Sequence, residues 1–198
     1  MDTGADGPEV EAPFVLESGQ DLALKQRVAR AAAALIDPGD VVILDIGTTT
    51  ALLARELRGR DVTVITSNLG VLDELRNDDA VRVVLLGGVV RRNYQTLVGS
   101  LAESGLRQVN ADAVFLSCTG VRRNGRVVDN MAVETPIKQA MIDAADQVVL
   151  LATEAKFPGT GSLRVCSLNT IDVLVTTDGA DTSTTQLCRD AGGRVITV

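Results

Sequence analysis

Apolar runs alternate with helical patterns along most of the chain, and the clearest run comes early. In Val41–Ile46 five of six residues are apolar, which is typical of a strand buried on both faces of a parallel sheet. The run stops at Gly47, and Thr48–Thr50 precede a helical pattern that starts at Ala51. Unpaired N–H groups, the helix dipole and three hydroxyls at such a junction favour an anion such as phosphate. A plain turn with threonine as N-cap would leave the same pattern.

Further apolar runs follow at intervals that leave room for helices between them. They predict strands at Asp61–Thr66, Val81–Leu86, Asp112–Ser117, Gln147–Ala152, Asp172–Thr176 and Arg194–Thr197. Helical spacing predicts helices near Asp21–Ile36, 51–57, 69–75, Leu101–Val109, Glu134–Ala144 and Thr182–Ala191. Val89–Gly99 suits a short hairpin, and Val121–Ala132 a turn-rich connection. The alternation predicts a Rossmann-like α/β domain, with a mainly parallel sheet, helices on both faces and small irregular excursions.

The composition fits one such domain and narrows its partners. Residues 1–12 are rich in Asp, Glu, Gly and Pro and predict a flexible leader, so the folded domain is expected over residues 13–198. Only 2% of the residues are aromatic, so the core must be built from Val, Leu, Ala and Ile. The net charge of −7 makes the chain by itself a poor binder of nucleic acid, which requires clustered Lys and Arg.

Several kinds of chemistry find no support in the sequence. Histidine, the commonest general base and transition-metal ligand, does not occur, and three scattered cysteines fit neither a disulfide framework nor a zinc site. Neither G-x-G-x-x-G nor a P-loop motif occurs, so we expect neither NAD nor ATP, no cofactor and no metal. Without a secretion signal or 18 uninterrupted apolar residues, the sequence predicts a cytoplasmic protein and no membrane partner.

In open parallel sheets, ligands bind beyond the carboxyl ends of the strands. The predicted strand ends of this chain carry glycine, hydroxyl, amide and charged residues in place of large apolar ones. The candidate ligand-binding residues there are Asp45, Gly47, Thr48, Thr49, Thr50, Asn68, Gly87, Gly88, Gly120 and Lys156. Together they predict a crevice for a polar, phosphorylated small molecule.

Glu134 and Lys138 are further candidates, because they lie four residues apart and share one face of a predicted helix. The same spacing is typical of an exposed ion pair, and an isolated loop lysine such as Lys156 is usually solvated. Asp45 would be costly to bury alone, so it either caps the following turn or accepts from a ligand hydroxyl. Most arginines of the two irregular segments are expected at the surface, and one could reach a phosphate.

Several short motifs occur along the chain in a fixed order and at characteristic spacings, and they are informative only as a set. They are Pro13-Phe14, Lys25, Leu44-Asp45-Ile46-Gly47-Thr48-Thr49-Thr50, Val64-Ile65-Thr66-Ser67-Asn68, Leu86-Gly87-Gly88, Leu97-Val98-Gly99, Glu134-Thr135-Pro136-Ile137-Lys138, Leu151-Ala152 and Lys156-Phe157. This set resembles the sensor domain of DeoR-family bacterial transcription regulators over about residues 13–178. Thr153-Glu154-Ala155 departs from the Asp-Ser-Ser usual in that family, which bears on the choice of effector.

The resemblance implies a fold shared with ribose-5-phosphate isomerase and CoA transferases, used as a receptor for phosphorylated sugars or related metabolites. Asp45 and Gly47–Thr50 would form the phosphate loop, Asn68, Gly87 and Gly88 would line the sugar cleft, and Glu134, Lys138 and Lys156 would surround its mouth. In such regulators an N-terminal winged helix-turn-helix binds operator DNA. We expect no such DNA-binding domain within residues 1–12, because twelve residues are too few to form one.

A sugar-phosphate isomerase on the same fold is the alternative function. Glu134 with a lysine could supply a base and a polarising cation. The isomerases carry an Asp-Gly-Ala-Asp stretch, however, where this chain has residues 117–121 without a carboxylate, so we favour a sensor with no catalytic residue. A scaffold with a degenerate pocket is a third possibility. Paired operator half-sites imply a homodimer or higher oligomer, with Val89, Val90 and Val98 as interface candidates.

Overall fold

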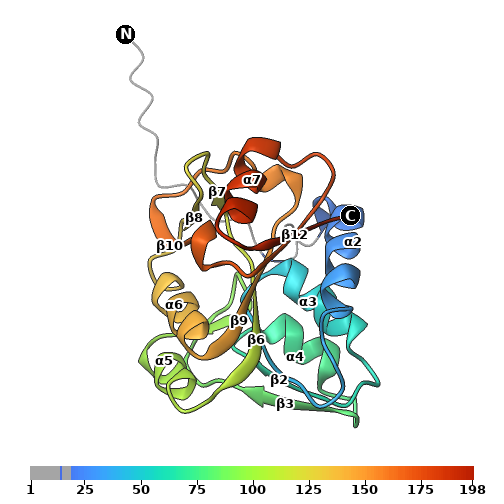
Figure 1. Cartoon of the computed structure of the whole chain (residues 1–198). Helices are drawn as coiled ribbons and strands as arrows, with labels where there is room; N and C mark the ends of the chain where they lie inside the picture. The colour runs from blue at the N-terminus through green and yellow to red at the C-terminus, as the bar shows by residue number, and fades with distance from the viewer. Residues whose placement is uncertain (1–13, 15–18) are drawn as a thin grey trace.

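The computed structural model describes Phe14 and residues 19–198, so the expected leader, residues 1–12, lies outside the described residues. Its centre is a seven-stranded sheet in which every neighbouring pair is parallel (Figure 1). From one edge to the other the strands are β12 (Arg194–Thr197), β11 (Val173–Thr176), β9 (Ala145–Leu151), β6 (Ala111–Leu116), β1 (Val41–Leu44), β2 (Val62–Thr66) and β3 (Val81–Leu85).

The strand order reverses direction next to β1, and this reversal determines where a ligand can bind. From β1 the chain adds β2 and β3 on one side, whereas β6, β9, β11 and β12 extend the sheet on the other side. The connections that follow β1 and β6 therefore diverge to opposite faces and leave a crevice between them. Such a crevice at the carboxyl ends of the strands is the usual ligand site of open α/β sheets.

Helices cover both faces of the sheet because the strands present apolar side chains on both sides. Val42 and Leu44 of β1 belong to one apolar cluster, and Ile43 between them belongs to the other. The first cluster includes residues of α2 (Leu22–Ala33), α3 (Thr48–Glu56) and α4 (Leu69–Leu75), and the second includes residues of α5 (Ser100–Leu106), α6 (Thr135–Asp143) and α7 (Thr182–Asp190). The prediction of a Rossmann-like α/β fold is thereby confirmed.

Two small antiparallel sheets leave the main sheet. The segment predicted as a hairpin forms β4 (Val89–Arg91) and β5 (Thr96–Val98). The other sheet combines β7 (Gly120–Val121), β8 (Arg126–Asp129) and β10 (Leu163–Ser167). Its pairing was not predicted, because these strands are short and β10 comes from a distant part of the sequence. The 3-10 turns η1 (Glu154–Lys156) and η2 (Leu168–Thr170) flank β10.

Three further details of the structure bear on the predictions. Val89 and Val90 are 70% and 51% exposed, but Val98 is only 7% exposed and belongs to the core, so it is not an available interface residue. Helix α2 ends at Ala33, three residues before the predicted end, because the chain turns there before Asp37-Pro38-Gly39. Among the described residues, no helix combines the length and the apolar character needed to span a membrane.

Candidate functional site

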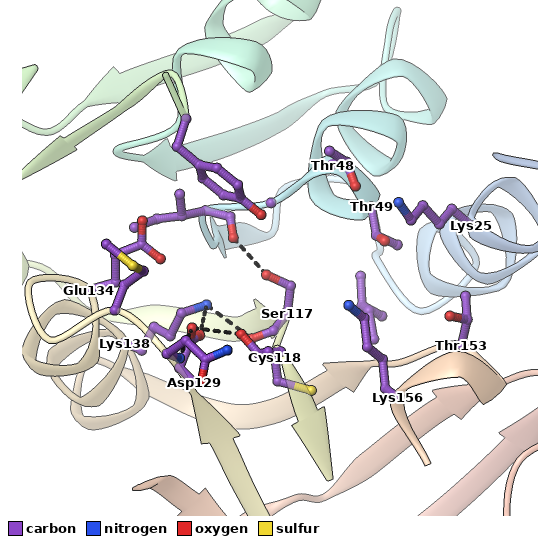
Figure 2. Close-up of a pocket in the computed structure, with 17 residues that line it drawn as sticks. Lys25, Thr48, Thr49, Ser117, Cys118, Asp129, Glu134, Lys138, Thr153 and Lys156 are labelled. Atoms are coloured by element: carbon purple, nitrogen blue, oxygen red, sulfur yellow. Dashed lines mark hydrogen bonds and ion pairs between the residues drawn. The ribbon is translucent and has the colours of Figure 1, made fainter. Parts of the chain in front are cut away.

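A cavity of about 310 Å³ lies at the carboxyl ends of β1, β6 and β9 (Figure 2). It faces Glu134 and Lys156, as the sequence predicted, and the loop after β1 forms part of its wall. Its lining consists of Lys25, Ile46, Gly47, Thr48, Thr49, Tyr94, Ser117, Cys118, Thr119, Asp129, Asn130, Met131, Glu134, Lys138, Leu151, Thr153 and Lys156.

Gly47 is required where the chain passes from β1 to α3. A Cβ atom at this position would lie 2.5 Å from the hydroxyl oxygen of Ser117. That hydroxyl is fixed at 2.6 Å from the carbonyl of Ile46 and at 3.0 Å from Asp45 Oδ2. The absence of a side chain at Gly47 therefore lets the loops after β1 and β6 approach each other at the base of the cavity.

The three threonines after Gly47 divide into two roles. Thr48 and Thr49 line the cavity at the first turn of α3, whose N–H groups have no acceptor within the helix. Thr50 is fully buried and points away from it, because its hydroxyl donates to the carbonyls of Asp45 at 2.7 Å and Gly47 at 2.9 Å. Thr50 therefore stabilises the loop instead of lining the cavity.

Asn68 supports the same loop from the end of β2. Its amide nitrogen donates to the carbonyl oxygens of Gly47, at 3.0 Å, and Asp45, at 3.3 Å. Its amide oxygen accepts the N–H of Gly70 at 2.9 Å and so caps α4. The side chain is fully buried and does not line the cavity, so the predicted contact of Asn68 with a sugar is replaced by a supporting role.

One end of the cavity, which we call the carboxylate end, is defined by Ser117, Asp129, Glu134 and Lys138. Lys138 is 2% exposed and extends from α6 to Asp45, with its ammonium nitrogen 2.5 Å from Asp45 Oδ2. The same nitrogen lies 3.5 Å from Asp129 Oδ2 and donates to the carbonyl of Ser117 at 3.0 Å. The buried positive charge thus has two carboxylates and a carbonyl as partners. Figure 2 shows the contacts of Lys138 with Asp129 and Ser117.

The protonation of Lys138 follows from these partners. Burial by itself would lower the pKa of this ammonium group, but the negative charges of Asp45 and Asp129 raise it well above its ordinary value. Asp45 is fully buried and is separated from the cavity by its neighbours, although its Oδ2 also accepts the N–H of Ser117 at 2.9 Å. Asp45 therefore anchors Lys138 and does not cap the turn or line the cavity.

Glu134 also lines the cavity, but its ion-pair partner is an arginine of β4 and not Lys138. Its carboxylate forms an ion pair with Arg91 of β4, whose guanidinium lies 5.8 Å from the centre of the Tyr94 ring. Burial raises the pKa of Glu134 to about 7, against the opposing effects of Lys138 and Arg91. Glu134 and Lys138 are 3% and 2% exposed, so the alternative of an exposed ion pair on a helix surface is wrong.

The opposite end, which we call the lysine end, is defined by Lys25, Thr48, Thr49, Thr153 and Lys156. Figure 2 shows Lys25 and Lys156 pointing toward the first turn of α3 from two directions. Lys25 belongs to α2 and is 6% exposed, whereas Lys156 belongs to η1 and is half-buried. Within the described part of the chain, Lys156 forms no ion pair with a carboxylate. The lysine end therefore combines positive charge with hydroxyl and N–H donors.

Half of the residues predicted for ligand binding come together around the cavity. These are Gly47, Thr48, Thr49, Glu134, Lys138 and Lys156. The other six do not line the cavity. They are Asp45, Thr50, Asn68 and the three glycines after β3 and β6, namely Gly87, Gly88 and Gly120. A Cβ at Gly88 would lie 2.7 Å from the carbonyl of Val98, and one at Gly120 would lie 2.5 Å from Gly159, so each allows close packing of backbones. Gly87 faces Leu101.

The sequence reasoning also missed residues of the lining. Ser117, Cys118 and Thr119 follow β6 directly, but of this strand end only Gly120 was predicted to bind a ligand. Asp129 had no signal, because it comes from the irregular segment and is positioned by β8; its Oδ1 accepts from the hydroxyl of Thr119 at 2.9 Å. Burial raises the pKa of the Cys118 thiol to about 12, so this thiol stays protonated. Among the described residues no cluster of Cys, Asp and Glu could hold a metal ion.

Relatives of known class match most of this chain. It is 30% identical over 192 residues to a putative aga operon transcriptional repressor of Escherichia coli O157:H7, covering 96% of this chain and 71% of the relative. It is 33% identical over 152 residues to the HTH-type transcriptional repressor GlcR of Bacillus subtilis, covering 77% of this chain and 58% of the relative. An L-fucose operon activator of Escherichia coli is 28% identical, covering 82% of this chain and 67% of the relative.

Solved structures share the fold at low sequence identity. Ribose 5-phosphate isomerase A of Methanocaldococcus jannaschii has a TM-score of 0.51 at 20% identity, covering 69% of this chain and 55% of the other. eIF2B beta of Chaetomium thermophilum has a TM-score of 0.55 at 17% identity, covering 77% and 48%. The family model of the DeoR C-terminal sensor domain matches residues 20–178. The chain therefore belongs to the DeoR family of transcription regulators, and residues 20–178 are its C-terminal sensor domain.

Proposed function

We propose that the cavity binds a phosphorylated sugar or a related phosphorylated metabolite, and that this binding controls a transcription regulator of which the chain is the sensing part. The observation that carries the proposal is the division of the cavity into a lysine end and a carboxylate end. A sugar phosphate has the same division, with a dianionic group at one end and hydroxyl groups along the rest of the molecule.

The lysine end suits the phosphate group. The N–H groups of the first turn of α3 and the helix dipole attract an anion, and the hydroxyls of Thr48 and Thr49 add donors. Lys25 and Lys156 contribute two positive charges. The carboxylates that line the cavity, Asp129 and Glu134, are already paired with Lys138 and Arg91, so they oppose a second anion less than free carboxylates would.

The carboxylate end suits the hydroxyl groups of the sugar. Ser117, Thr119 and Asn130 present short polar side chains there, and Glu134 offers carboxylate oxygen as an acceptor. Hydrogen bonds to Asp45 and Asp129 hold the hydroxyls of Ser117 and Thr119, so these two groups are oriented before a ligand enters, which reduces the entropic cost of binding. The relative named as an L-fucose operon activator supports a sugar-derived effector.

Operator DNA is the second proposed partner, contacted through a part of the regulator outside this sensor domain. The chain spans 58–71% of the length of the two repressors described above, and one of these is of the HTH type. The acidic charge of −7 supports a sensing role for this part and not a DNA-reading role. We further propose that the protein acts in the cytoplasm as a homodimer or higher oligomer, because operator half-sites are commonly paired.

We propose binding and not catalysis, although the fold is shared with isomerases. An isomerisation requires a carboxylate base and a positioned cation that act on the same part of the substrate. Residues 117–121 supply serine, cysteine, threonine and glycine but no carboxylate, and Glu134 is paired with Arg91. The chain therefore lacks a free carboxylate at the end of β6, where the alternative function would need one.

The proposal is tested by thermal unfolding with D-ribose 5-phosphate, D-fructose 6-phosphate, D-glucose 6-phosphate and inorganic phosphate. A ligand at 100 times its Kd should stabilise the folded chain by about 2.7 kcal/mol. Stabilisation by a sugar phosphate, without conversion of that sugar in an overnight incubation, would support a sensor. Conversion of an aldose phosphate to a ketose phosphate would contradict it, as would the failure of every phosphorylated metabolite in a broad panel.

A further inference from the structure

Phe14 is anchored to the sensor domain at a place far from its own position in the sequence. Its ring makes an edge-to-face contact with Tyr94, with ring centres 6.0 Å apart and planes at 89°. Its backbone N–H donates to the carbonyl of Asn93 at 2.9 Å, and the residue is only 9% exposed. The turn between β4 and β5 therefore holds both the ring and the backbone of Phe14.

Gly70 forms the opposite wall of this seat. A Cβ at Gly70 would lie 2.8 Å from the Cζ atom of Phe14, so the ring packs directly on the backbone of α4. Alanine favours a helix more than glycine does by about 1 kcal/mol, so helix propensity does not explain the glycine at this position. The packing of Phe14 does explain it. We call the contact surface formed by Gly70, Asn93 and Tyr94 the Phe14 seat.

Both walls of the Phe14 seat are also parts of the cavity or its direct supports. Tyr94 lines the cavity, and its hairpin is tied to the carboxylate end by the ion pair between Arg91 and Glu134. On the other wall, Gly70 donates to Asn68, and Asn68 donates to the carbonyl of Gly47, which lines the cavity. A ligand that moves Tyr94 or the loop after β1 must therefore change the shape of the Phe14 seat.

We infer that the Phe14 seat couples occupancy of the cavity to the segment that precedes the sensor domain. This inference rests on the proposed function, because it specifies how binding at that cavity is passed on. The matched family is a C-terminal sensor domain, so the remainder of such a regulator lies on the amino-terminal side, to which Phe14 belongs. Coupling is reciprocal: if a ligand strengthens the seating of Phe14, a seated Phe14 strengthens binding of the ligand by the same factor.

The direction of the coupling follows from the contacts. A seated Phe14 braces Tyr94 from one side and α4 from the other, so it holds the cavity walls in place before a ligand arrives. Phe14→Ala should then weaken binding of a sugar phosphate by at least about fivefold, the lower end of typical coupling. Gly70→Ala should weaken binding in the same way by displacing the ring, and it should add little in a Phe14→Ala background, where no ring remains to be displaced.

The experiment uses the full chain with the sugar phosphate that gives the largest thermal shift, and with inorganic phosphate as a smaller probe. Tyr94 is the only tyrosine and the chain has no tryptophan, so tyrosine emission reports on this seat and should change when the sugar phosphate binds. Affinity is measured for the wild type, for the two single variants and for the double variant. Ile36→Ala is the matched control. Ile36 is also buried, but it precedes β1 and so lies near the amino ends of the strands, whereas the cavity lies at their carboxyl ends.

A second measurement requires no ligand. Urea unfolding of Phe14→Ala, Glu134→Gln and the double variant should show non-additive midpoints, because both residues hold the same β4–β5 hairpin, Phe14 through Tyr94 and Glu134 through Arg91. Additive midpoints, or sugar phosphate affinities within twofold of the wild type in both Phe14→Ala and Gly70→Ala, would overturn the coupling. If the wild type binds no probe, the proposed function fails by itself, whereas the urea comparison still decides whether the Phe14 seat and the carboxylate end are linked.

Discussion

Lys138 and Lys156 line one cavity, yet their surroundings differ in almost every respect. Lys138 is buried with Asp45 and Asp129, and its charge is neutralised inside the protein. Lys156 is half-buried on a 3-10 turn and forms no ion pair with the carboxylates of the described residues. Lys138 therefore holds the cavity together, whereas Lys156 is the lysine that we propose to contact the ligand. Stability measurements and affinity measurements should separate these two roles.

The largest effect is expected from Lys138→Met, which keeps the length of the side chain and removes its charge. Asp45 and Asp129 would remain buried without their counter-charge, which should lower the free energy of unfolding by about 3–5 kcal/mol. Urea unfolding monitored by circular dichroism measures this loss. Arg30→Met is the control, because Arg30 forms an exposed ion pair with Glu56 at 3.6 Å and should change stability by less than about 1 kcal/mol. Equal losses in both variants would remove the distinction between the two lysines.

The second effect concerns the ligand alone. Thr49→Asp places a negative charge at the lysine end, where it would repel a phosphate by several kcal/mol and weaken binding about 100-fold or more. The fold should tolerate aspartate there, since an acidic residue in the first turn of a helix is favourable. Thr49→Asn is the neutral control of similar shape and should retain most of the affinity. Calorimetric titration with the best sugar phosphate measures both, and full affinity in Thr49→Asp would show that the phosphate binds elsewhere.

A smaller effect is expected from Lys156→Met. Loss of one hydrogen bond to a charged group should cost about 1.5–3 kcal/mol of binding free energy, or roughly 10- to 150-fold in Kd. The free energy of unfolding should change by less than about 0.5 kcal/mol, because Lys156 has no ion-pair partner in the described fold. Titration and urea unfolding of the same sample test this split. A large loss of stability would mean that Lys156 resembles Lys138 after all.

The smallest effect is a dependence on pH that originates at the carboxylate end. Since burial raises the pKa of Glu134 to about 7, the folded chain binds more protons than the unfolded chain between the ordinary glutamate pKa and about 7. Stability contributed by Glu134 should therefore fall as the pH rises through that window. Glu134→Gln should reduce the difference in unfolding free energy between pH 5.5 and pH 8.0 by on the order of 1 kcal/mol. An unchanged difference would contradict the raised pKa.

Prediction from the sequence succeeded where chemistry follows directly from a strand end. Thr48 and Thr49 directly follow Gly47, so their place at the cavity follows from the buried strand before them and the helix that they begin. Prediction failed where a glycine is needed because two backbone segments pack closely together. Gly88 and Gly120 resemble ligand-binding glycines in the sequence, but backbones approach each other there, and only the folded chain shows which partner is near.

The sequence by itself determined the α/β class, the family and the existence of a polar site at the carboxyl edge of the sheet. These depend on local patterns: apolar runs of strand length, helical spacing, and polar residues directly after each strand. The tertiary structure decided that Asp45 and Asp129, 84 residues apart in the chain, share the charge of Lys138, and that Arg91 and not Lys138 pairs with Glu134. Contacts between distant segments depend on how β1, β6 and the small sheets pack together. No local pattern encodes that arrangement, because the energy of a buried charge depends on every group that surrounds it in space.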